Sequence, residues 1–138
     1  MAYAAGKDTV FKLDNSGGTL QTLTAYVESL QAAVQKIALL ETTTMGDSAK
    51  DFITGLKEGD FTISGPWEGA TMDAHLGGLL GNSATSSFEI HPAGTGSGLP
   101  KYTGECWLES YDISSTVDGL VEYTAKFVCS GAVTRGTN

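Results

Sequence analysis

The sequence predicts a mainly β domain, built as a β-sandwich or partly closed barrel of six to eight strands, with one flanking α-helix at about 71–80 and a long loop at about 42–59. Apolar and polar residues alternate along several segments, most regularly from Val121 to Cys129, as they do in strands with one buried face. The 18 glycines, against only 3 prolines, indicate many turns. In a sandwich or partly closed barrel the apolar faces of the strands pack against one another, and one helix can pack on the sheet, so this fold class fits both observations.

The length of 138 residues fits a single domain, 1–138, which buries roughly two thirds of the surface of its unfolded chain. Hydrophobic residues make up 41% of the chain and charged residues 17%, as in ordinary globular proteins. The two ends, 1–8 and 131–138, are polar and poorly anchored, so we expect them to be either extended arms or frayed ends.

The first part of the chain contains one clear strand and two ambiguous segments. Thr9 to Leu13 alternates and ends at the turn-forming residues 14–18. Segment 23–30 has apolar residues at helical spacing, and segment 33–40 has good helix formers but also alternates. We predict strands for both, because the rest of the chain has β character and needs pairing partners.

A long polar loop precedes the next strand, which is predicted at 60–64. Between Glu41 and Lys50 only Met45 and Ala49 are apolar, so burial cannot hold the loop down. Structureless loops of this length are usually functional or disordered. The loop carries no reactive group of residues, which favours a surface for partner proteins over a pocket for substrates.

The clearest helix runs from Thr71 to Leu80. Thr71 can cap its first turn, Asp73 suits the positive end of its dipole, and its apolar residues form one stripe. Gly81 and the following asparagine stop it.

Three further strands complete the predicted sheet, at 87–91, 101–113 and 120–133. The first two are joined by a glycine-rich connection, and the last two by a turn that contains Asp118-Gly119, a strong hairpin signal. The residues that we expect in the core are Phe61, Ile63, Leu76, Phe88, Ile90, Tyr123 and Phe127.

The net charge of −8 argues against sequence-specific nucleic-acid binding, because such binding neutralises phosphates with basic side chains. No segment approaches the roughly 20 consecutive apolar residues that cross a bilayer, and the N-terminus lacks the features of a signal peptide. We therefore expect no membrane association and synthesis in the cytoplasm. Cys106 and Cys129 are too few for a disulfide scaffold and are expected to be buried thiols.

No group of residues predicts catalysis, a cofactor or a metal. His75 and His91 have no companions at metal-ligand spacing. The glycines of 94–98 lack the strand-to-helix context of a phosphate-binding loop, and no Gly-x-Ser-x-Gly motif occurs. The carboxylates between 41 and 60 lack the spacing of a calcium-binding loop and are predicted to be solvated.

Three segments, taken in order, resemble one known family. Residues 39–69 read LLETTTMGDSAKDFITGLKEGDFTISGPWEG, residues 71–81 read TMDAHLGGLLG, and residues 100–137 read PKYTGECWLESYDISSTVDGLVEYTAKFVCSGAVTRGT. In this order and spacing they resemble the major tail protein, or tail tube protein, of long-tailed bacteriophages, and the motifs favour the non-contractile kind. The match covers most of residues 38–137.

The resemblance implies a β-sandwich with a flanking helix, whose copies join edge to edge into hexameric rings with part of each sheet lining a central channel. Stacked rings would form the tail tube of the virion, through which DNA passes without specific binding. An acidic protein suits this role, because like charges repel across a Debye length of about 8 Å, so we expect a neutral or mildly acidic channel. The protein would be made and assembled in the host bacterial cytoplasm, and its partners would be itself and the tail terminator, tape measure and tail-tip proteins.

The same resemblance assigns the long loop to contacts between rings or neighbouring subunits. A loop with few anchors can become ordered when it docks on a neighbour. The ends 1–8 and 131–138, if extended, would reach adjacent subunits. The residues predicted for the loop contacts are Thr42, Thr43, Thr44, Met45, Gly46, Asp47, Lys50, Asp51, Phe52 and Lys57.

Two other functions stay open at this point. A capsid decoration or head-tail joining protein could share a small β-sandwich with an acidic surface. A small-ligand-binding barrel would need an apolar cavity lined by Phe61, Trp67, Tyr123 and Phe127, which more simply fill a core. For an enzymatic function, the sequence offers no candidate catalytic residue.

Overall fold

The computed structural model describes residues 3–138. One α-helix, α1 (Met72–Leu79), and two 3₁₀ turns, at Gly6–Asp8 and Thr24–Tyr26, accompany the strands of a seven-stranded sheet. The strands are β1 (Val10–Asp14), β2 (Leu20–Thr22), β3 (Ser29–Glu41), β4 (Phe52–Pro66), β5 (Ser86–His91), β6 (Pro100–Ser114) and β7 (Glu122–Thr137).

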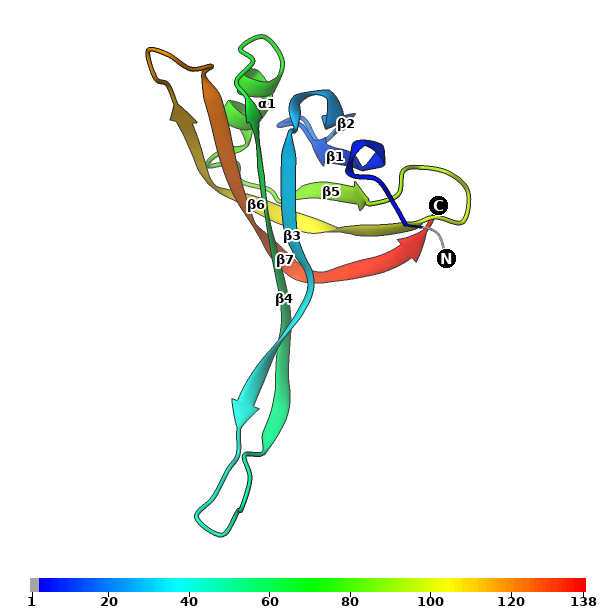
Figure 1. Ribbon diagram of the computed structural model, residues 1–138, viewed down its shortest axis with the longest axis vertical. Coiled ribbons are helices and arrows are strands. Elements are labelled where there is room, and N and C mark those ends of the chain that lie inside the picture. The colour runs from blue at the N-terminus through cyan, green and yellow to red at the C-terminus, as the bar shows by residue number, and fades with distance from the viewer. Residues whose placement is uncertain (1–2) are drawn as a thin grey trace.

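The strands form one antiparallel sheet in the order β2-β1-β5-β6-β7-β4-β3. The long strands β6 and β7 curve, so the sheet folds over into two layers, one that contains β1, β2 and β5 and one that contains β3 and β4 (Figure 1). Among the described residues the edge strands β2 and β3 do not pair, so the sheet stays open rather than closing into a barrel. This architecture confirms the predicted fold class.

Two glycines allow the layers to separate at one end of the molecule. Gly131 has a φ of 83°, which favours glycine, and lies where β7 bends away from β4. Gly59 lies where β4 leaves β7, and a Cβ at this position would be 3.0 Å from both the Ala33 carbonyl oxygen and Val133 Cγ2. Beyond this point β4 pairs only with β3.

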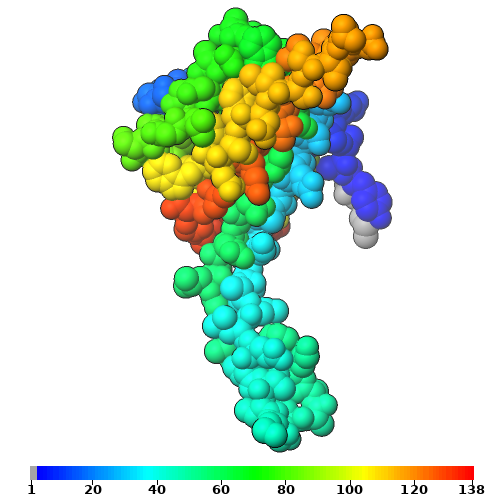
Figure 2. Space-filling view, turned by 90° about the vertical axis from the view of Figure 1, so that its left-hand side faces the viewer, coloured from blue at the N-terminus to red at the C-terminus, as the bar shows by residue number. Residues whose placement is uncertain are grey.

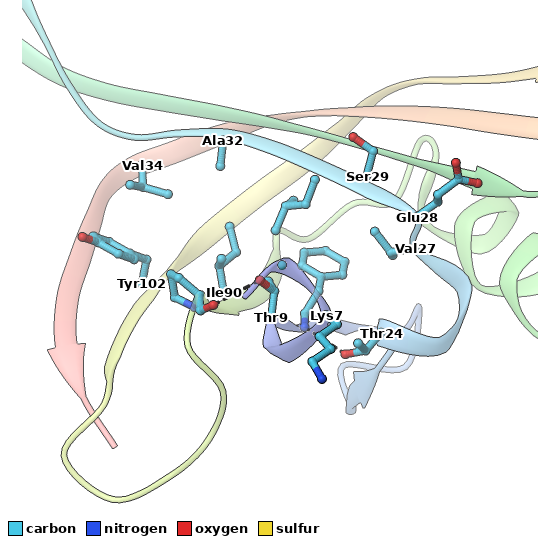
Figure 3. Close-up of a pocket in the computed structure, with 14 residues that line it drawn as sticks. Lys7, Thr9, Thr24, Val27, Glu28, Ser29, Ala32, Val34, Ile90 and Tyr102 are labelled. Atoms are coloured by element: carbon cyan, nitrogen blue, oxygen red, sulfur yellow. Dashed lines mark hydrogen bonds between the residues drawn. The ribbon is translucent and has the colours of Figure 1, made fainter. Parts of the chain in front are cut away.

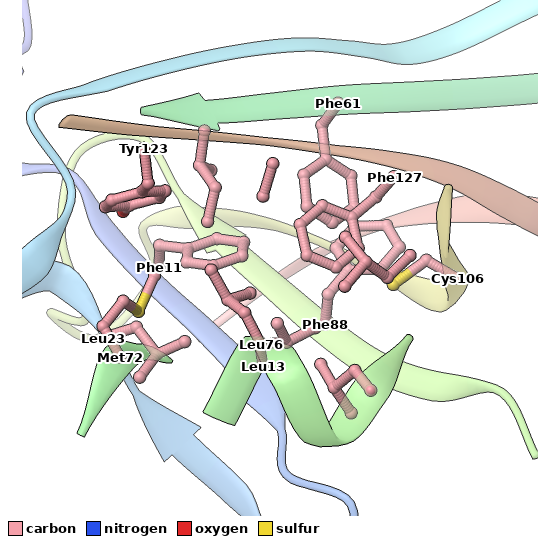
Figure 4. Close-up of a cluster of buried hydrophobic side chains, with 14 of the residues drawn as sticks. Phe11, Leu13, Leu23, Phe61, Met72, Leu76, Phe88, Cys106, Tyr123 and Phe127 are labelled. Carbon is pink, nitrogen blue, oxygen red and sulfur yellow. The ribbon is translucent and has the colours of Figure 1, made fainter. Parts of the chain in front are cut away.

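The core lies between the two layers and against α1 (Figure 4). Phe61 occupies its centre, with its ring centroid 4.7 Å from those of Phe88 and Phe127 and 5.6 Å from that of Phe11. The residues expected in the core all belong to this buried cluster: Phe61, Ile63, Leu76, Phe88, Ile90, Tyr123 and Phe127.

Helix α1 forms where it was predicted, but its cap is different. Glu68, not Thr71, accepts the hydrogen bonds of the first turn, from the backbone N–H groups of Ala70, Thr71 and Met72 at 2.7–2.9 Å. These bonds, led by the one from Met72, lower the pKa of the Glu68 carboxyl. A glutamate can replace the predicted cap because its longer side chain reaches three orphan N–H groups at once.

His75 fixes α1 to the sheet. Its Nε2 lies 2.8 Å from the carbonyl oxygen of Asp14 in β1. Burial lowers the pKa of His75, since desolvation disfavours the charged imidazolium. The neutral side chain therefore donates this hydrogen bond from Nε2.

Three boundaries differ from the expectation. Segment 23–30 is not one strand: Thr24–Tyr26 forms a 3₁₀ turn, where Thr24 accepts a hydrogen bond from the Phe11 N–H, and only residues 29–30 belong to a strand, β3. The long loop spans only 42–51, since 52–59 belongs to β4.

The third difference concerns the ends of the chain. Residues 131–137 continue β7 and pair with β6 at 100–103, so they belong to the sheet and form neither an arm nor a frayed end. Within the N-terminal segment 1–8, residues 6–8 form a 3₁₀ turn, and residues 1–2 lie outside the described part.

Candidate assembly surfaces

A two-stranded ribbon projects from the body of the molecule (Figures 1 and 2). It consists of Lys36–Glu41 of β3 and Phe52–Glu58 of β4, joined by the loop 42–51, and we call residues 36–58 the arm. The stem of the arm spans roughly 20 Å at the usual rise of a β-strand. A register shift between Ala33 and Lys36 marks its base. No other described strand pairs with it.

The arm exposes apolar side chains on both of its faces. Leu40 lies opposite Ile53 on one face, and Leu39 and Phe52 lie on the other. Each of these side chains exposes more than half of its surface, and Leu56 exposes 86%. An isolated two-stranded ribbon is at best marginally stable, and large exposed apolar patches mark interaction sites. The arm therefore lacks, among residues 3–138, a partner that covers its apolar side chains.

The loop at the end of the arm is held by local hydrogen bonds. Asp47 accepts bonds from the N–H of Thr44 at 2.7 Å and from its hydroxyl at 3.3 Å. Asp51 donates its N–H to Thr43 Oγ1 at 2.9 Å and accepts the N–H of Thr42 at 2.9 Å. The predicted contact residues divide between this loop, which contains Thr42, Thr43, Thr44, Met45, Gly46, Asp47, Lys50 and Asp51, and the stem, which contains Phe52 and Lys57.

Two backbone edges flank the four strands β3, β4, β7 and β6. The outer edge of β3 has no partner strand among residues 3–138. On the far side, β5 pairs with β6 only at 102–106, so residues 107–114 of β6 also present an unpaired edge. Unpaired edges of this length are templates for strand pairing with another chain.

The four strands carry their core residues on one face, and the other face is uncovered and mostly polar, with Val128 and Trp107 exposed in the row of Asp60. The register aligns Ser29, Ser64, Thr124 and Asp112 in one row across this bare face. A second row consists of Gln31, Thr62, Lys126 and Ser110, and none of these eight residues is buried.

The charge of the bare face is negative. Its carboxylates come from Asp60, Glu109, Asp112 and Glu122, against the single ammonium group of Lys126. That ammonium group lies 3.8 Å from Glu109 Oε2, an ion pair that neutralises it locally.

A cleft of about 670 Å³ lies in the open seam between β3 and the layer of β1 and β5 (Figure 3). Ala32 and Val34 face it from β3, and Ile90 and Tyr102 face it from the other side. The cavity expected for a small-ligand barrel is not this one. Phe61, Tyr123 and Phe127 are packed in the core.

The remaining member of that expected cavity, Trp67, lies at the surface. Its Nε1–H donates to the Tyr111 hydroxyl at 3.1 Å, and Tyr111 donates to Asp73 Oδ1 at 2.8 Å. Desolvation, together with the bond to Asp73, raises the pKa of Tyr111 to about 12.

The residues considered as metal ligands or nucleophiles do not form a reactive site in the described part of the chain. Within residues 3–138, no three His, Cys, Asp or Glu side chains converge on a possible metal position. Cys106 and Cys129 lie opposite each other on β6 and β7 as free thiols. Burial raises the pKa of both thiols, that of Cys129 to about 11, so neither is a reactive nucleophile near neutral pH. No helix in the described part is long and apolar enough to cross a membrane.

Comparison with known families decides what these surfaces belong to. Residues 3–135 match the family model described as phage tail tube protein, which is nearly the whole chain. The chain belongs to the phage tail tube protein family. The tail tube subunit is therefore a structural protein of the virion tail. Comparison with curated protein sequences gives no match.

Solved structures with the same fold come from several tail-like assemblies. The tail tube subunit is similar to a chain from the tail of an empty gene transfer agent particle with C6 symmetry, with a TM-score of 0.80, 16% identity and coverage of 98% of this chain and 100% of that one. It is also similar to a chain of the SPP1 tail tube, with a TM-score of 0.78, 13% identity and coverage of 99% and 80%. A chain from the sheath–tube complex of an extracellular contractile injection system gives a TM-score of 0.68, 11% identity and coverage of 99% and 93%.

Sequence reasoning found the loop of this tail tube subunit but missed the stem of the arm and the bare face. Leu39 and Leu40 resemble the end of a buried strand, and Phe52 and Ile53 fell inside the predicted loop. One signal was present: adjacent apolar pairs flank a polar loop symmetrically, as the two strands of a hairpin would.

Proposed function

We propose that six copies of this chain form a ring through their free sheet edges, and that stacked rings form the tube that conducts the genome out of the virion. The observation that carries the proposal is the pair of unpaired edges, on β3 and on residues 107–114 of β6, at the two sides of one four-stranded unit. Pairing the β3 edge of one copy with this β6 edge of the next extends the sheet without a break. Repetition around an axis closes a ring in which neither of these two edges stays exposed.

Six copies are chosen because the structurally similar gene transfer agent tail has C6 symmetry. Six units of four strands, at a strand spacing of about 4.8 Å, give a barrel whose facing backbones lie about 35–45 Å apart, depending on strand tilt. Side chains narrow this opening, and the remaining channel is wide enough for a DNA duplex.

The bare face lines the channel in this arrangement, because the opposite face of the same four strands is filled by the core. Serine and threonine side chains dominate its rows, and carboxylates outnumber ammonium groups on it. Such a surface offers phosphates no cluster of cations, so DNA passes without being held.

The arm makes contacts between subunits of neighbouring rings. It projects beyond the four-stranded unit, so edge pairing within one ring leaves its apolar faces uncovered. The role of the chain is structural and involves no catalytic step. Tail terminator, tape measure and tail-tip proteins complete the set of partners, and assembly takes place in the cytoplasm of the host bacterium.

Electron microscopy of the purified protein tests the proposed function. At rising protein concentration, negatively stained samples should show hollow tubes with six-fold symmetry in end-on views. Isolated rings at every concentration would instead fit a head-tail joining protein, and trimers would fit a capsid decoration protein. A persistent monomer would contradict the proposal.

Labelling of the assembled tubes tests the position of the bare face. Thr124→Cys places a thiol on that face, and a large polymer-linked maleimide should modify it readily in the monomer but at least about tenfold more slowly in the tube. Ala74→Cys, on the exposed side of α1, is the matched control and should react at similar rates in both states. The raised pKa values of the two native thiols keep the background low. Equal protection of both positions would refute the assignment of the channel.

A further inference from the structure

A second apolar projection lies at the end of the molecule opposite the arm. It consists of the last two residues of β6 and the turn between β6 and β7, residues 113–121, which we call the β6–β7 tip (Figure 1). Val117 is fully exposed, and Ile113 and Leu120 each expose more than half of their surface. In Figure 2 the β6–β7 tip stands out at the top of the molecule and the arm at the bottom.

The topology places these two projections at opposite ends. β4 starts in the arm and ends at Pro66, which pairs with Glu122 at the beginning of β7. Because β7 is antiparallel to β4, the turn that precedes it stands at the end of β4 remote from the arm. The two ends of the subunit's longest axis are therefore different: one end carries the arm and the other carries the β6–β7 tip, and both expose apolar side chains.

We propose that the β6–β7 tip of one copy receives the arm of a copy in the adjacent ring. The inference rests on the proposed function, since it names the surface on which the arm docks when rings stack. A contact between two different surfaces of identical subunits is heterologous, and it continues as an open stack when it does not close. Rings that present tips on one side and arms on the other can add one after another without limit.

Of the two projections, only the arm carries basic residues. The chain contains no basic residue between Lys101 and Lys126, and the region of the β6–β7 tip carries Asp112, Asp118 and Glu122. The arm contains three of the eight lysine and arginine residues of the chain, together with four carboxylates: Lys36, Lys50 and Lys57, and Glu41, Asp47, Asp51 and Glu58.

The lysines of the arm differ in their partners. Lys36 is paired with Glu58 at 3.6 Å. In the described part of the chain, Lys50 and Lys57 have no carboxylate within ion-pair distance. Both can therefore meet the carboxylates around the β6–β7 tip without giving up an existing ion pair.

A symmetrical pairing of like ends fits less well. Two β6–β7 tips in contact would bring their carboxylates together with no cation between 102 and 125, and like-charge juxtaposition opposes such complexes. Two arms in contact would form an isologous pair of rings that cannot grow into a stack. Contact between the arm and the β6–β7 tip covers the exposed apolar side chains of both and offers the carboxylates of the tip to Lys50 and Lys57.

The first test is the double variant Val117→Asp, Leu120→Asp. Both side chains are exposed in the single subunit, so the variant should keep the parent's melting temperature. It should still form rings, and tubes should need at least about tenfold more protein, because carboxylates then oppose an apolar surface. The control Leu80→Asp, at an exposed position just after α1, should assemble like the parent.

The second test mixes two single-cysteine additions, Val117→Cys and Leu56→Cys, in one tube and oxidises them with oxidised glutathione. Covalent dimers should form between the two variants, and each variant alone should give at least about tenfold fewer. If the parent forms tubes, two results would overturn this inference alone: normal tubes from the double aspartate variant, or the absence of the mixed dimer. Failure of the parent chain to form rings would instead overturn the proposed function.

Discussion

A variant without the arm is expected to fold like the parent chain and to form no tubes. Residues 38–56 would be replaced by Asn-Gly, a two-residue hairpin link suited to the directly paired Ile37 and Lys57. The body should be unaffected, because the deleted side chains belong neither to the buried core nor to the residues packed against it. Rings should persist, since both free sheet edges of the four-stranded unit remain.

The expected result has two readouts: a melting temperature within a few degrees of the parent's, and electron micrographs that show rings without tubes. A matched control keeps the length of the arm and replaces Leu39, Phe52 and Ile53 with threonine, which retains strand propensity. This control should lose tubes as well, because the contact depends on apolar surface rather than on reach. Normal tubes from the deletion variant would contradict the role given to the arm.

The strands of the body were predictable because their alternation reports burial within the chain. In β7 the side chains of Tyr123, Ala125 and Phe127 point into the core and their neighbours point out, which is the pattern that a half-buried strand requires. The helix α1 was predictable from its cap region and stripe, although Glu68 supplies the cap.

The arm could not be located from sequence, because an apolar segment does not show whether its side chains are buried by the same chain or by a neighbouring subunit. Leu39 and Phe52 are as apolar as core residues, yet each exposes more than half of its surface in the single subunit. A sequence specifies that such side chains need burial, and only the fold shows that the chain itself does not bury them. The same ambiguity affects Thr62 and Thr124, whose polarity suits bulk water and an aqueous channel equally.

The C-terminal segment was misjudged for a different reason. Gly131 and Gly136 interrupt its apolar pattern, and glycine in a strand usually weakens the prediction. In the structure Gly131 provides the bend that carries β7 from one layer to the other, and the residues after it pair with 100–103 of β6. The strand continues because its partner curves with it, which is a tertiary effect outside the range of local propensity.

Replacing Phe61 with alanine is expected to cause the largest loss of stability of any single substitution. The ring is almost fully buried and touches Phe11, Phe88 and Phe127, so its removal leaves a cavity that rigid neighbours cannot refill. Such phenylalanine-to-alanine changes cost about 3–5 kcal/mol of unfolding free energy, out of a total of about 5–15 kcal/mol in typical domains. The substitution therefore removes a large share of what holds the subunit folded.

Urea unfolding at a protein concentration below the onset of assembly measures this loss without a contribution from subunit contacts. The control is Thr62→Ala, the next residue of β4, whose side chain points to the bare face; it should change the unfolding free energy by less than about 1 kcal/mol. Phe61→Leu should fall between the two, because it retains part of the buried volume. A loss below about 1 kcal/mol for Phe61→Ala would show that the two layers are not held together by this aromatic cluster. In that case the face opposite the core could not be assigned to the channel, since the assignment depends on the core filling the other face of the same four strands.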